Sequence, residues 1–535
     1  MTPVVGLGGC SRPADLAPLS GGWIGAAVER GHLLRGGTPA RQAAAPVARR
    51  TSVLIVGAGV AGLACARALQ QRGIDDLRLL ELEDTAGGNS RGHRIGEIAC
   101  PLGAHYLPVP GDEAVELIEL LAGFGLCSIE YGRRVWDERH LCHSPQERLF
   151  VADAAAPFGG HWVDGLLPPP ELLPAGERDL LRTEQSRFAT QIARQMRSGR
   201  FVIPAVRGGF DDEARSLDAI SFATWLDREG FRSAALRWYL DYCCRDDCGA
   251  GIGRVSAWAG LHYFASRHGF AAADDADADD PGILTWPEGN GWLTSRMAAP
   301  FSDRLLGGRS VLRIDEGRHA VAVDAWDHAA QRLERWSATQ VVLATPLFIA
   351  ARLLANPPPA LPQAAARIEQ APWLVANLQI DEALHDRPGA APSWDNVIYR
   401  GRTLGYVDAM HQSARPHPGP TVLTAYWPLG GDDAGDAAAA RRRLLDQPWQ
   451  AWADGVLDDL ATAHPDLRSK LRRIELMRHG HAMAIPTPGT RSDPALAALS
   501  RGRGRVAFAH ADLSGYSIFE EAFFHGHRVG GSLKL

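Results

Sequence analysis

Apolar and polar residues follow two different periods along the chain, and these periods predict its elements. Residues 53–56 and 77–82 are short apolar runs typical of buried strands, and the Ala- and Leu-rich stretch 60–71 between them has helical spacing. Further along, aromatic and β-branched runs between residues 373 and 429 predict several antiparallel strands, and helical spacing returns between residues 441 and 473. The pattern predicts an α/β chain with an inserted region of mixed α+β structure.

A glycine motif lies at the junction of the first strand and the first helix. Gly57 permits a tight turn, Gly59 lets backbone N–H groups approach a pyrophosphate, and Gly62 lets the helix pack closely on the strand. With Val60 and Ala61, these residues form the helix N-terminus, where unpaired N–H donors and the positive end of the helix dipole favour an anion. The strand, the turn and the helix together predict a dinucleotide site.

An acidic residue and a second glycine pair extend this motif. Glu81 lies near the end of the second apolar run, at the distance from Gly62 where an acid accepts hydrogen bonds from ribose hydroxyls. Glu83 is the alternative, since it shares a strand face with Glu81. Gly87 and Gly88 predict another close approach of the backbone, which a longer cofactor needs and an NAD-only domain does not. The pair therefore favours FAD over NAD.

At these positions the chain resembles the FAD-dependent amine oxidase superfamily, which also includes protoporphyrinogen oxidases and carotene desaturase-type enzymes. In that superfamily a glycine pair follows the acid at the spacing found here, and an arginine usually follows the pair. This chain has Asn89 at that position and Arg91 two residues later. The resemblance implies that Gly87, Gly88, Asn89 and Arg91 contact the cofactor.

Two more distant segments carry the same resemblance. The sequence PLGAHYLP, at residues 101–108, resembles the segment that passes the flavin ring, which implies backbone contacts from Gly103, Ala104 and His105. In the C-terminal segment, Asp512 occupies the position of a family acid that holds a ribityl or phosphate-side hydroxyl. Because segments this far apart agree, the resemblance implies a single cofactor, FAD.

The resemblance implies a Rossmann-type, glutathione reductase-like FAD-binding domain with an inserted α+β substrate domain. The expected boundaries are 51–110, 283–350 and 488–535 for the discontinuous FAD-binding domain, and 111–282 and 351–487 for the substrate domain. Residues 1–50 are rich in Gly, Ala, Pro and Arg without a sustained period, so we expect an unstructured leader there.

Length, composition and charge limit the remaining possibilities. A chain of 535 residues is too long for one simple core, and 46% hydrophobic with 22% charged residues is typical of a soluble globular protein. A net charge of −6 argues against nucleic acid or an anionic membrane surface as partner. We find no run of about 18 apolar residues, which a membrane span needs. Cys10 follows a segment that resembles the end of a bacterial lipoprotein signal, so we expect a cytoplasmic protein or, if the start is truncated, a periplasmic lipoprotein.

The resemblance also implies an activity. An FAD-dependent oxidoreductase of this kind moves a hydride from a small organic molecule, either an amine or a larger apolar compound, to the flavin. Oxygen or an unidentified acceptor then takes the electrons. Amine oxidases typically place a lysine near flavin N5, but Lys470 lies in a helical part of the inserted region and Lys534 is next to the C-terminus, so we assign no catalytic residue.

Other polar residues have both a functional and a structural interpretation. Tyr239, Arg245, Asp246 and His262 lie in a region that alternates aromatic and charged residues, so they either line a substrate cavity or form a polar network among helices. The cysteine and histidine spacings do not match a zinc site, and we expect no metal.

Two other function classes compete with an FAD oxidoreductase. An NAD-dependent dehydrogenase would use only the first glycine motif, which leaves the second glycine pair and the Asp512 segment unexplained. A non-catalytic escort of prenylated proteins would use the same fold without redox chemistry.

Overall fold

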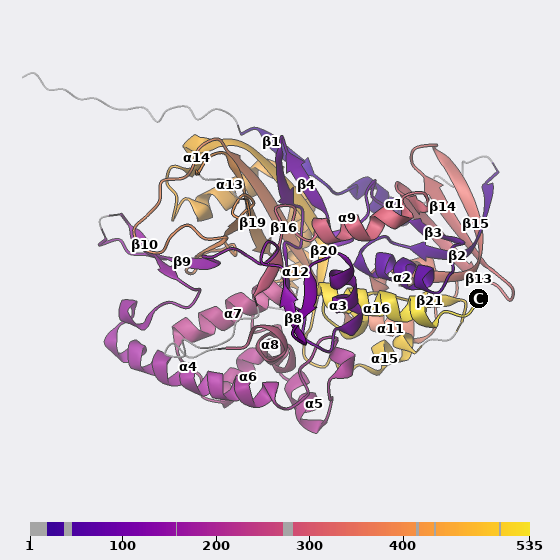
Figure 1. Ribbon diagram of the computed structural model, residues 1–535. Coiled ribbons are helices and arrows are strands. Elements are labelled where there is room, and N and C mark those ends of the chain that lie inside the picture. The colour runs from indigo at the N-terminus through magenta and orange to yellow at the C-terminus, as the bar shows by residue number, and fades with distance from the viewer. Residues whose placement is uncertain are drawn as a thin grey trace, which may run out of the picture.

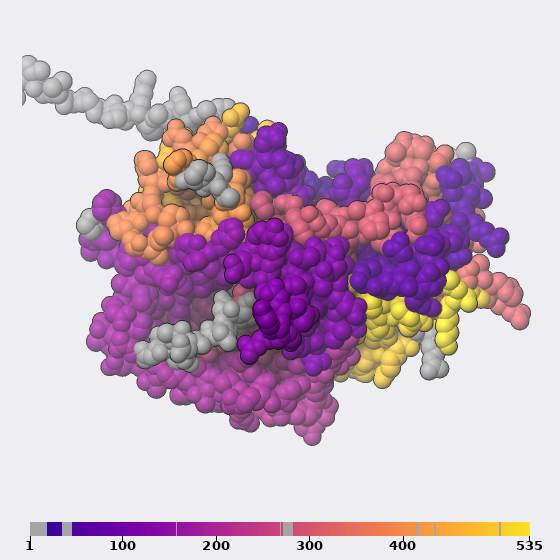
Figure 2. Space-filling model, viewed as in Figure 1, coloured from indigo at the N-terminus to yellow at the C-terminus, as the bar shows by residue number. Residues whose placement is uncertain are grey.

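The computed structural model describes residues 19–36, 45–156, 158–270, 282–413, 417–432, 435–501 and 504–535. These residues build two large sheets, one toward each end of the view in Figure 1, and a group of helices lies below the second sheet. In Figure 2 an early part of the chain, in indigo, lies against the C-terminal segment, in yellow. Both ends of the chain therefore contribute to the same part of the molecule.

The first sheet contains the predicted glycine motif. Its strands are β2 (Val47–Val56), β3 (Leu77–Leu80), β12 (Leu305–Leu306), β13 (Arg309–Glu316), β14 (Val321–Asp327), β15 (Arg332–Leu343) and β21 (Val506–Phe508). They follow the order β12-β3-β2-β15-β14-β13, with β21 beside β15. Strands β2, β3, β12, β15 and β21 are parallel, and β13 and β14 add antiparallel strands. Val53, Leu54 and Ile55 are fully buried, as expected for a parallel strand covered on both faces.

A helix from the end of the chain covers the first helix of the motif. Helix α16 (Phe519–Ser532) packs along α2 (Val60–Gln71). Glycine makes this approach possible, because a Cβ on Gly526 would lie 2.0 Å from the carbonyl oxygen of Ala61. A Cβ on Gly530 would likewise lie 2.5 Å from the carbonyl oxygen of Cys65. The C-terminal helix thus holds α2 against the sheet.

The second sheet is mainly antiparallel. Its strands are β1 (Gly21–Ile24), β9 (Glu147–Ala152), β10 (Gly160–Asp164), β16 (Glu369–Ile380), β17 (Asp395–Ile398), β18 (Tyr406–Asp408), β19 (Thr421–Pro428) and β20 (Leu471–Ile485), in the order β1-β20-β16-β19-β18-β17-β9-β10. Strand β16 pairs antiparallel with both β19 and β20. The antiparallel strands predicted between residues 373 and 429 are therefore confirmed.

Five helices form a layer beside this sheet. They are α4 (Ala175–Met196), α5 (Asp212–Asp218), α6 (Phe222–Arg228), α7 (Ala234–Cys248) and α8 (Ala257–Tyr263). Ser221, Ser233 and Ser256 begin α6, α7 and α8, and each side chain accepts a hydrogen bond from a backbone N–H in the first turn. Phe188 and Trp258 lie in the apolar core that joins these helices to the sheet.

Shorter strands and helices connect the two sheets and the helical layer. The strands are β4 (Gly92–Ile95), β5 (Ile98–Pro101), β6 (Tyr106–Pro108), β7 (Cys127–Glu130), β8 (Arg133–Trp136) and β11 (Ile283–Thr285). The helices are α3 (Val115–Gly123), α9 (Gly291–Ala298), α10 (Leu347–Leu353), α11 (Ala360–Arg367), α12 (Asp436–Asp446), α13 (Trp449–Leu460), α14 (Leu467–Lys470) and α15 (Pro494–Ser500).

The prediction of an unstructured leader over residues 1–50 is wrong for its described part. Strand β1, helix α1 (Val28–Gly36) and the start of β2 all lie within it. Gly21 has a φ of +147°, and a Cβ there would lie 1.7 Å from the carbonyl oxygen of Ile474, its partner on β20. In the sequence these glycines indicated a loop, but the pairing of β1 with β20 requires glycine at this position. Cys10 lies outside the described residues.

The described residues contain neither a membrane-spanning helix nor a cluster of metal ligands. Every helix found there is too short or too polar to cross a bilayer. Within the same part of the chain, no group of three or more His, Cys, Asp or Glu side chains is arranged to hold a metal ion.

Candidate functional site

A cavity of about 460 Å³ is lined by residues of both sheets and of the helical layer. The glycine turn after β2, the end of β3 and the segment before β6 line it from the first sheet. Helix α7 and strands β16, β19 and β20 line it from the inserted region, and α16 contributes from the C-terminus. Segments from the whole length of the chain therefore meet at one hollow.

Most of the predicted cofactor residues line this cavity. They are Gly57, Gly59, Val60, Ala61, Glu81, Gly87, Gly88, Asn89, Gly103, Ala104 and His105. Gly62, Arg91 and Asp512 lie outside its lining. The structure thus brings eleven of the fourteen predicted residues to one surface.

The glycine turn has the geometry that the motif predicts. Gly57 has a φ of +98°, which favours glycine, and a Cβ on Gly62 would lie 2.0 Å from the carbonyl oxygen of Gly57. Gly62 therefore serves close packing of α2 on the strand, as predicted. A Cβ on Gly59 would be 3.7 Å from Cα of Gly88, so the two glycine segments lie against each other at the cavity wall.

Glu81, rather than Glu83, is the acid at this wall. Its carboxylate accepts hydrogen bonds from the backbone N–H of Ala58 at 2.7 Å and of Glu83 at 3.0 Å. Burial raises the pKa of the Glu81 carboxyl, although both donors act in the opposite direction. The Glu83 carboxylate instead accepts from the backbone N–H of Ala27 and lies 3.7 Å from the Arg91 guanidinium. The geometry therefore separates the two candidates.

Arg91 and Asp512 lie outside the cavity lining and hydrogen-bond to residues that belong to it. Arg91 is buried, and its Nε donates to the carbonyl oxygen of Gly88 at 3.2 Å. Asp512 is also buried and accepts hydrogen bonds from the backbone N–H of Leu347 at 2.9 Å and from Nε2 of Gln370 at 3.1 Å. Direct contact of either residue with a cofactor stays a prediction.

A carboxylate lies at the end of the cavity that the helical layer closes. The Tyr106 hydroxyl donates to Oδ2 of Asp246 at 2.9 Å, and both residues line the cavity. Burial raises the pKa of Asp246 to about 6, and the neighbouring Asp247 contributes to the rise. The Tyr106 hydrogen bond and the Arg267 charge oppose it. The carboxylate is therefore ionised at neutral pH yet weakly solvated.

Arg267 is already neutralised by two acids. It lies 2.8 Å from Asp247 and 2.8 Å from Glu520, and all three side chains are buried. With Asp246 ionised, this end of the cavity holds three carboxylates and one guanidinium. Its net charge is therefore negative.

Aromatic rings form the adjoining walls. The ring of His105 stacks on Tyr426 with centroids 4.2 Å apart, and Trp373 meets Tyr426 edge to face at 6.4 Å. Tyr426 donates its hydroxyl to the carbonyl oxygen of Gly103 at 3.0 Å. Burial lowers the pKa of His105 to about 3, so the ring is neutral. These rings line the same cavity as the Asp246 carboxylate.

The sequence identified only part of this end. Of the four polar residues considered, Asp246 lines the cavity, whereas Tyr239, Arg245 and His262 do not. Arg245 donates to the carbonyl oxygen of Arg402 on the surface, and His262 is packed among the helices.

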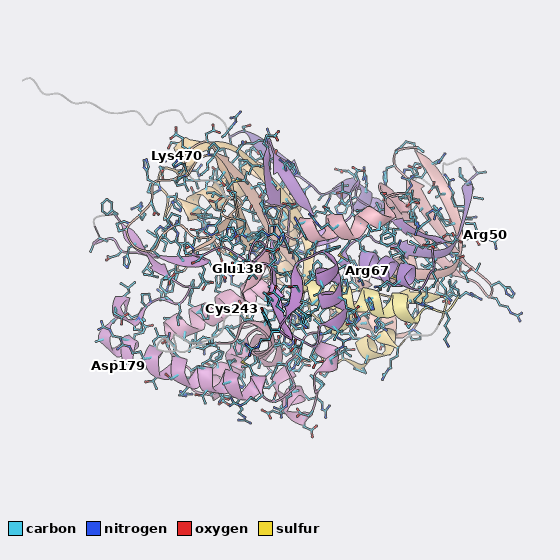
Figure 3. All side chains as sticks on the ribbon, viewed as in Figure 1. Arg50, Arg67, Glu138, Asp179, Cys243 and Lys470 are labelled. Atoms are coloured by element: carbon cyan, nitrogen blue, oxygen red, sulfur yellow. The ribbon has the colours of Figure 1, made fainter. Side chains whose placement is uncertain are left out.

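Both lysines of the chain lie away from the cavity. The ammonium group of Lys470 is 2.9 Å from Asp466, and Figure 3 shows Lys470 well apart from Cys243 on α7, the helix that carries Asp246. The carbonyl oxygen of Lys534 accepts from Gln340 near the C-terminus. The lysine that amine oxidases typically place near flavin N5 therefore has no counterpart here.

Comparison with known proteins agrees with the predicted fold. A family model described as flavin-containing amine oxidoreductase matches residues 60–530. Protein anon-37Cs of Drosophila melanogaster is 35% identical over 79 residues, which are 14% of this chain and 16% of that protein.

Solved structures resemble the chain over most of its length. Putrescine oxidase with bound putrescine has a TM-score of 0.62 at 16% identity, covering 90% of this chain and 98% of its own. Cyclohexylamine oxidase from Brevibacterium oxydans IH-35A has a TM-score of 0.62 at 19% identity, with the same coverage of 90% and 98%. At these identities the likeness concerns the fold, and it confirms the predicted fold class.

Proposed function

The chain belongs to the flavin-containing amine oxidoreductase family of FAD-dependent oxidoreductases, and from this premise we propose that its substrate is a cationic amine received by Asp246. We propose further that FAD occupies the glycine-lined part of the cavity. Glu81 would accept from the ribose hydroxyls, and Gly59 and Gly88 would let the pyrophosphate approach the backbone. The flavin ring would then pass Gly103, Ala104 and His105.

Unused polar atoms of the cavity support the fit of this cofactor. Thr345 Oγ1 and Asn290 Oδ1 are buried and line the cavity, and neither has a hydrogen-bond partner among the described residues. Buried polar groups are nearly always paired, so these two atoms indicate a polar ligand. The positive end of α2 faces the same part of the cavity and favours a diphosphate there.

The observation that carries the substrate proposal is the charge at the other end. Asp246 faces the cavity with one oxygen held by Tyr106, and Arg267 is paired with two other acids. In the described part of the cavity, this end offers no unpaired arginine or lysine that would receive a carboxylate or phosphate substrate. A protonated amine balances the negative charge, and neighbouring aromatic rings favour a cation further.

Each residue then has a defined task. FAD, when bound, accepts the hydride from the carbon next to nitrogen. Asp246 orients the ammonium group and, with its raised pKa, takes the proton that the nitrogen must lose before the C–H bond breaks. Tyr106 fixes the carboxylate by its hydrogen bond, and the stacked rings of His105 and Tyr426 keep water from the reacting atoms.

Anaerobic reduction of the bound flavin tests the proposal. The purified holoenzyme is mixed with an aliphatic amine, with the corresponding alcohol, and with a polyene or a porphyrinogen, and loss of flavin absorbance is followed. We expect the amine alone to reduce the flavin. Asp246→Asn should weaken the apparent binding of the amine by about 30-fold, the size expected when a charge-assisted hydrogen bond is lost.

An exposed acid provides the matched control. Asp227 on α6 is a surface partner of Arg232, and Asp227→Asn should leave amine binding unchanged. Reduction by the polyene or porphyrinogen but not by amines would refute the substrate proposal, as would an Asp246→Asn variant that binds amines as well as the wild type.

A further inference from the structure

We propose that residues 21–36, here called the N-terminal clasp, complete the adenosine end of the FAD site and slow the release of the cofactor. Arg30, Gly31 and Leu34 of α1 line the same cavity as Gly57 and Glu81. The family match covers residues 60–530, and the clasp lies outside that range. The inference rests on the FAD position proposed above.

Helix α1 is fixed to the segment that follows β3. The backbone N–H of Ala27 donates to both carboxylate oxygens of Glu83, at 3.1 and 3.2 Å. Arg30 donates from Nη1 to the carbonyl oxygen of Leu82 at 3.0 Å and to Asp84 at 2.8 Å. The helix is therefore attached to the residues that follow Glu81, where the ribose is expected.

The other end of the clasp is fixed to the second sheet. Residues Gly21 to Ile24 pair in parallel with Ile474 to Met477 of β20. Farther along the same strand, His479, His481 and Met483 line the cavity. The clasp thus contacts both sheets, through β1 on β20 and through α1 beside the end of β3.

The chemistry of this end suits an adenosine group. Leu34, Leu82 and Val311 offer an apolar slot for a flat heteroaromatic ring, and all three line the cavity. At Gly31 an added Cβ would come no closer than 4.0 Å to Leu82, so its backbone stands open to the cavity side. Arg30 also lines this end of the cavity, where its guanidinium is held by Asp84 and by the carbonyl oxygen of Leu82.

Release of FAD from the holoenzyme tests this role. Free flavin fluoresces more strongly than bound flavin, so release after dilution is followed by fluorescence, without substrate or turnover. Leu34→Ala should release FAD about ten-fold faster than the wild type, since a ten-fold change corresponds to the loss of one modest apolar contact. Gly31→Val should also speed release, because its side chain would occupy space on the cavity side of α1. Deleting residues 1–36 should produce a larger increase.

Two controls keep the result interpretable. Glu29 is an exposed residue of the same helix, and Glu29→Ala should release FAD at the wild-type rate. Leu34→Met preserves an apolar side chain of similar volume and should release FAD at close to the wild-type rate, which links the effect of Leu34→Ala to the lost apolar contact. Wild-type release rates in both Leu34→Ala and Gly31→Val would overturn the proposal. A wild-type protein that contains no FAD would instead refute the cofactor site itself.

Discussion

The Tyr106 hydroxyl donates a 2.9 Å hydrogen bond to Asp246, which lies 140 positions later in the chain. Tyr106 begins β6, directly after the segment that we place beside the flavin, and Asp246 lies on α7 of the inserted region. The bond therefore couples the cofactor side of the cavity to the proposed substrate side. The effect of this bond can be measured because the pKa of Asp246 is about 6, close to the pH of an ordinary activity assay.

Amine oxidation should depend on the ionisation of Asp246. Burial raises the pKa of this carboxyl to about 6, so lowering the pH through that value protonates it and removes the partner of the ammonium group. We expect kcat/KM for the amine to fall about ten-fold per pH unit below the pKa. Rates of anaerobic flavin reduction between pH 5 and 8, at about one-half unit steps, measure the profile. A profile that is flat through this range would contradict the assignment.

Tyr106→Phe should move that acidic limb to higher pH. The Tyr106 hydrogen bond lowers the pKa of Asp246, whereas burial raises it. Removing the hydroxyl leaves the burial unchanged, so the pKa of Asp246 should rise further. Tyr399→Phe is the matched control, since its buried hydroxyl has no hydrogen-bond partner among the described residues. The two pH profiles should differ in the position of the limb, and coincident profiles would exclude a role for the Tyr106 hydroxyl.

Asp246 should also cost the protein stability at neutral pH. Its pKa is raised from 3.8 to about 6 in the folded state, so the fold is penalised as the carboxyl ionises between these values. Asp246→Asn should therefore be more stable than the wild type above pH 7 by about 2 kcal/mol, and the difference should disappear below pH 4. Thermal unfolding of both proteins across this range checks the sign. A variant that is less stable at pH 7 would contradict the argument.

The sequence predicted the part of the site that depends on neighbouring residues. The glycine turn, α2 and Glu81 lie within one strand-turn-helix-strand unit, so their spacing alone defines their geometry. Tyr106, Asp246 and Arg267 meet only through folding of separate segments. No local period distinguishes them from ordinary polar residues of helices and strands, so the sequence offered Asp246 as one candidate among four but did not bring it together with Tyr106 and Arg267.

The N-terminal clasp was missed for a different physical reason. Strand β1 is an edge strand whose glycines permit close pairing with β20, and glycine in a sequence otherwise indicates a loop. Helix α1 is positioned by hydrogen bonds that Ala27 and Arg30 donate to Glu83 and Asp84 rather than by an apolar stripe of its own. The fold class was accessible from patterns, whereas contacts between distant segments were not.

Removing Arg267 should destabilise the protein strongly. Arg267→Met would leave Asp247 and Glu520 buried without their cation, and breaking a buried pair in this way costs about 4 kcal/mol. Arg232→Met is the control, because Arg232 and Asp227 form an exposed pair that contributes less than about 1 kcal/mol. Denaturant unfolding compares the two variants. Equal, small losses would show that the buried cluster is not an electrostatic unit.

Two glycines of the motif should respond differently to alanine. A Cβ on Gly62 would lie 2.0 Å from the carbonyl oxygen of Gly57, so Gly62→Ala must displace α2 and should lower the free energy of unfolding by about 2 kcal/mol. Gly59 has a φ of −73°, and its added Cβ would meet Cα of Gly88 at an ordinary 3.7 Å. The fold should therefore tolerate Gly59→Ala, but the new methyl group would stand where the backbone must approach a pyrophosphate.

FAD content and stability, measured on the same preparations, separate these two effects. Gly59→Ala should retain native circular dichroism while its bound flavin, measured by absorbance, falls about ten-fold at limiting FAD. Gly62→Ala should lose stability first, with any loss of flavin following from the displaced helix. If Gly59→Ala bound FAD as tightly as the wild type, the pyrophosphate would not pass between Gly59 and Gly88, and the proposed position of the cofactor would have to move.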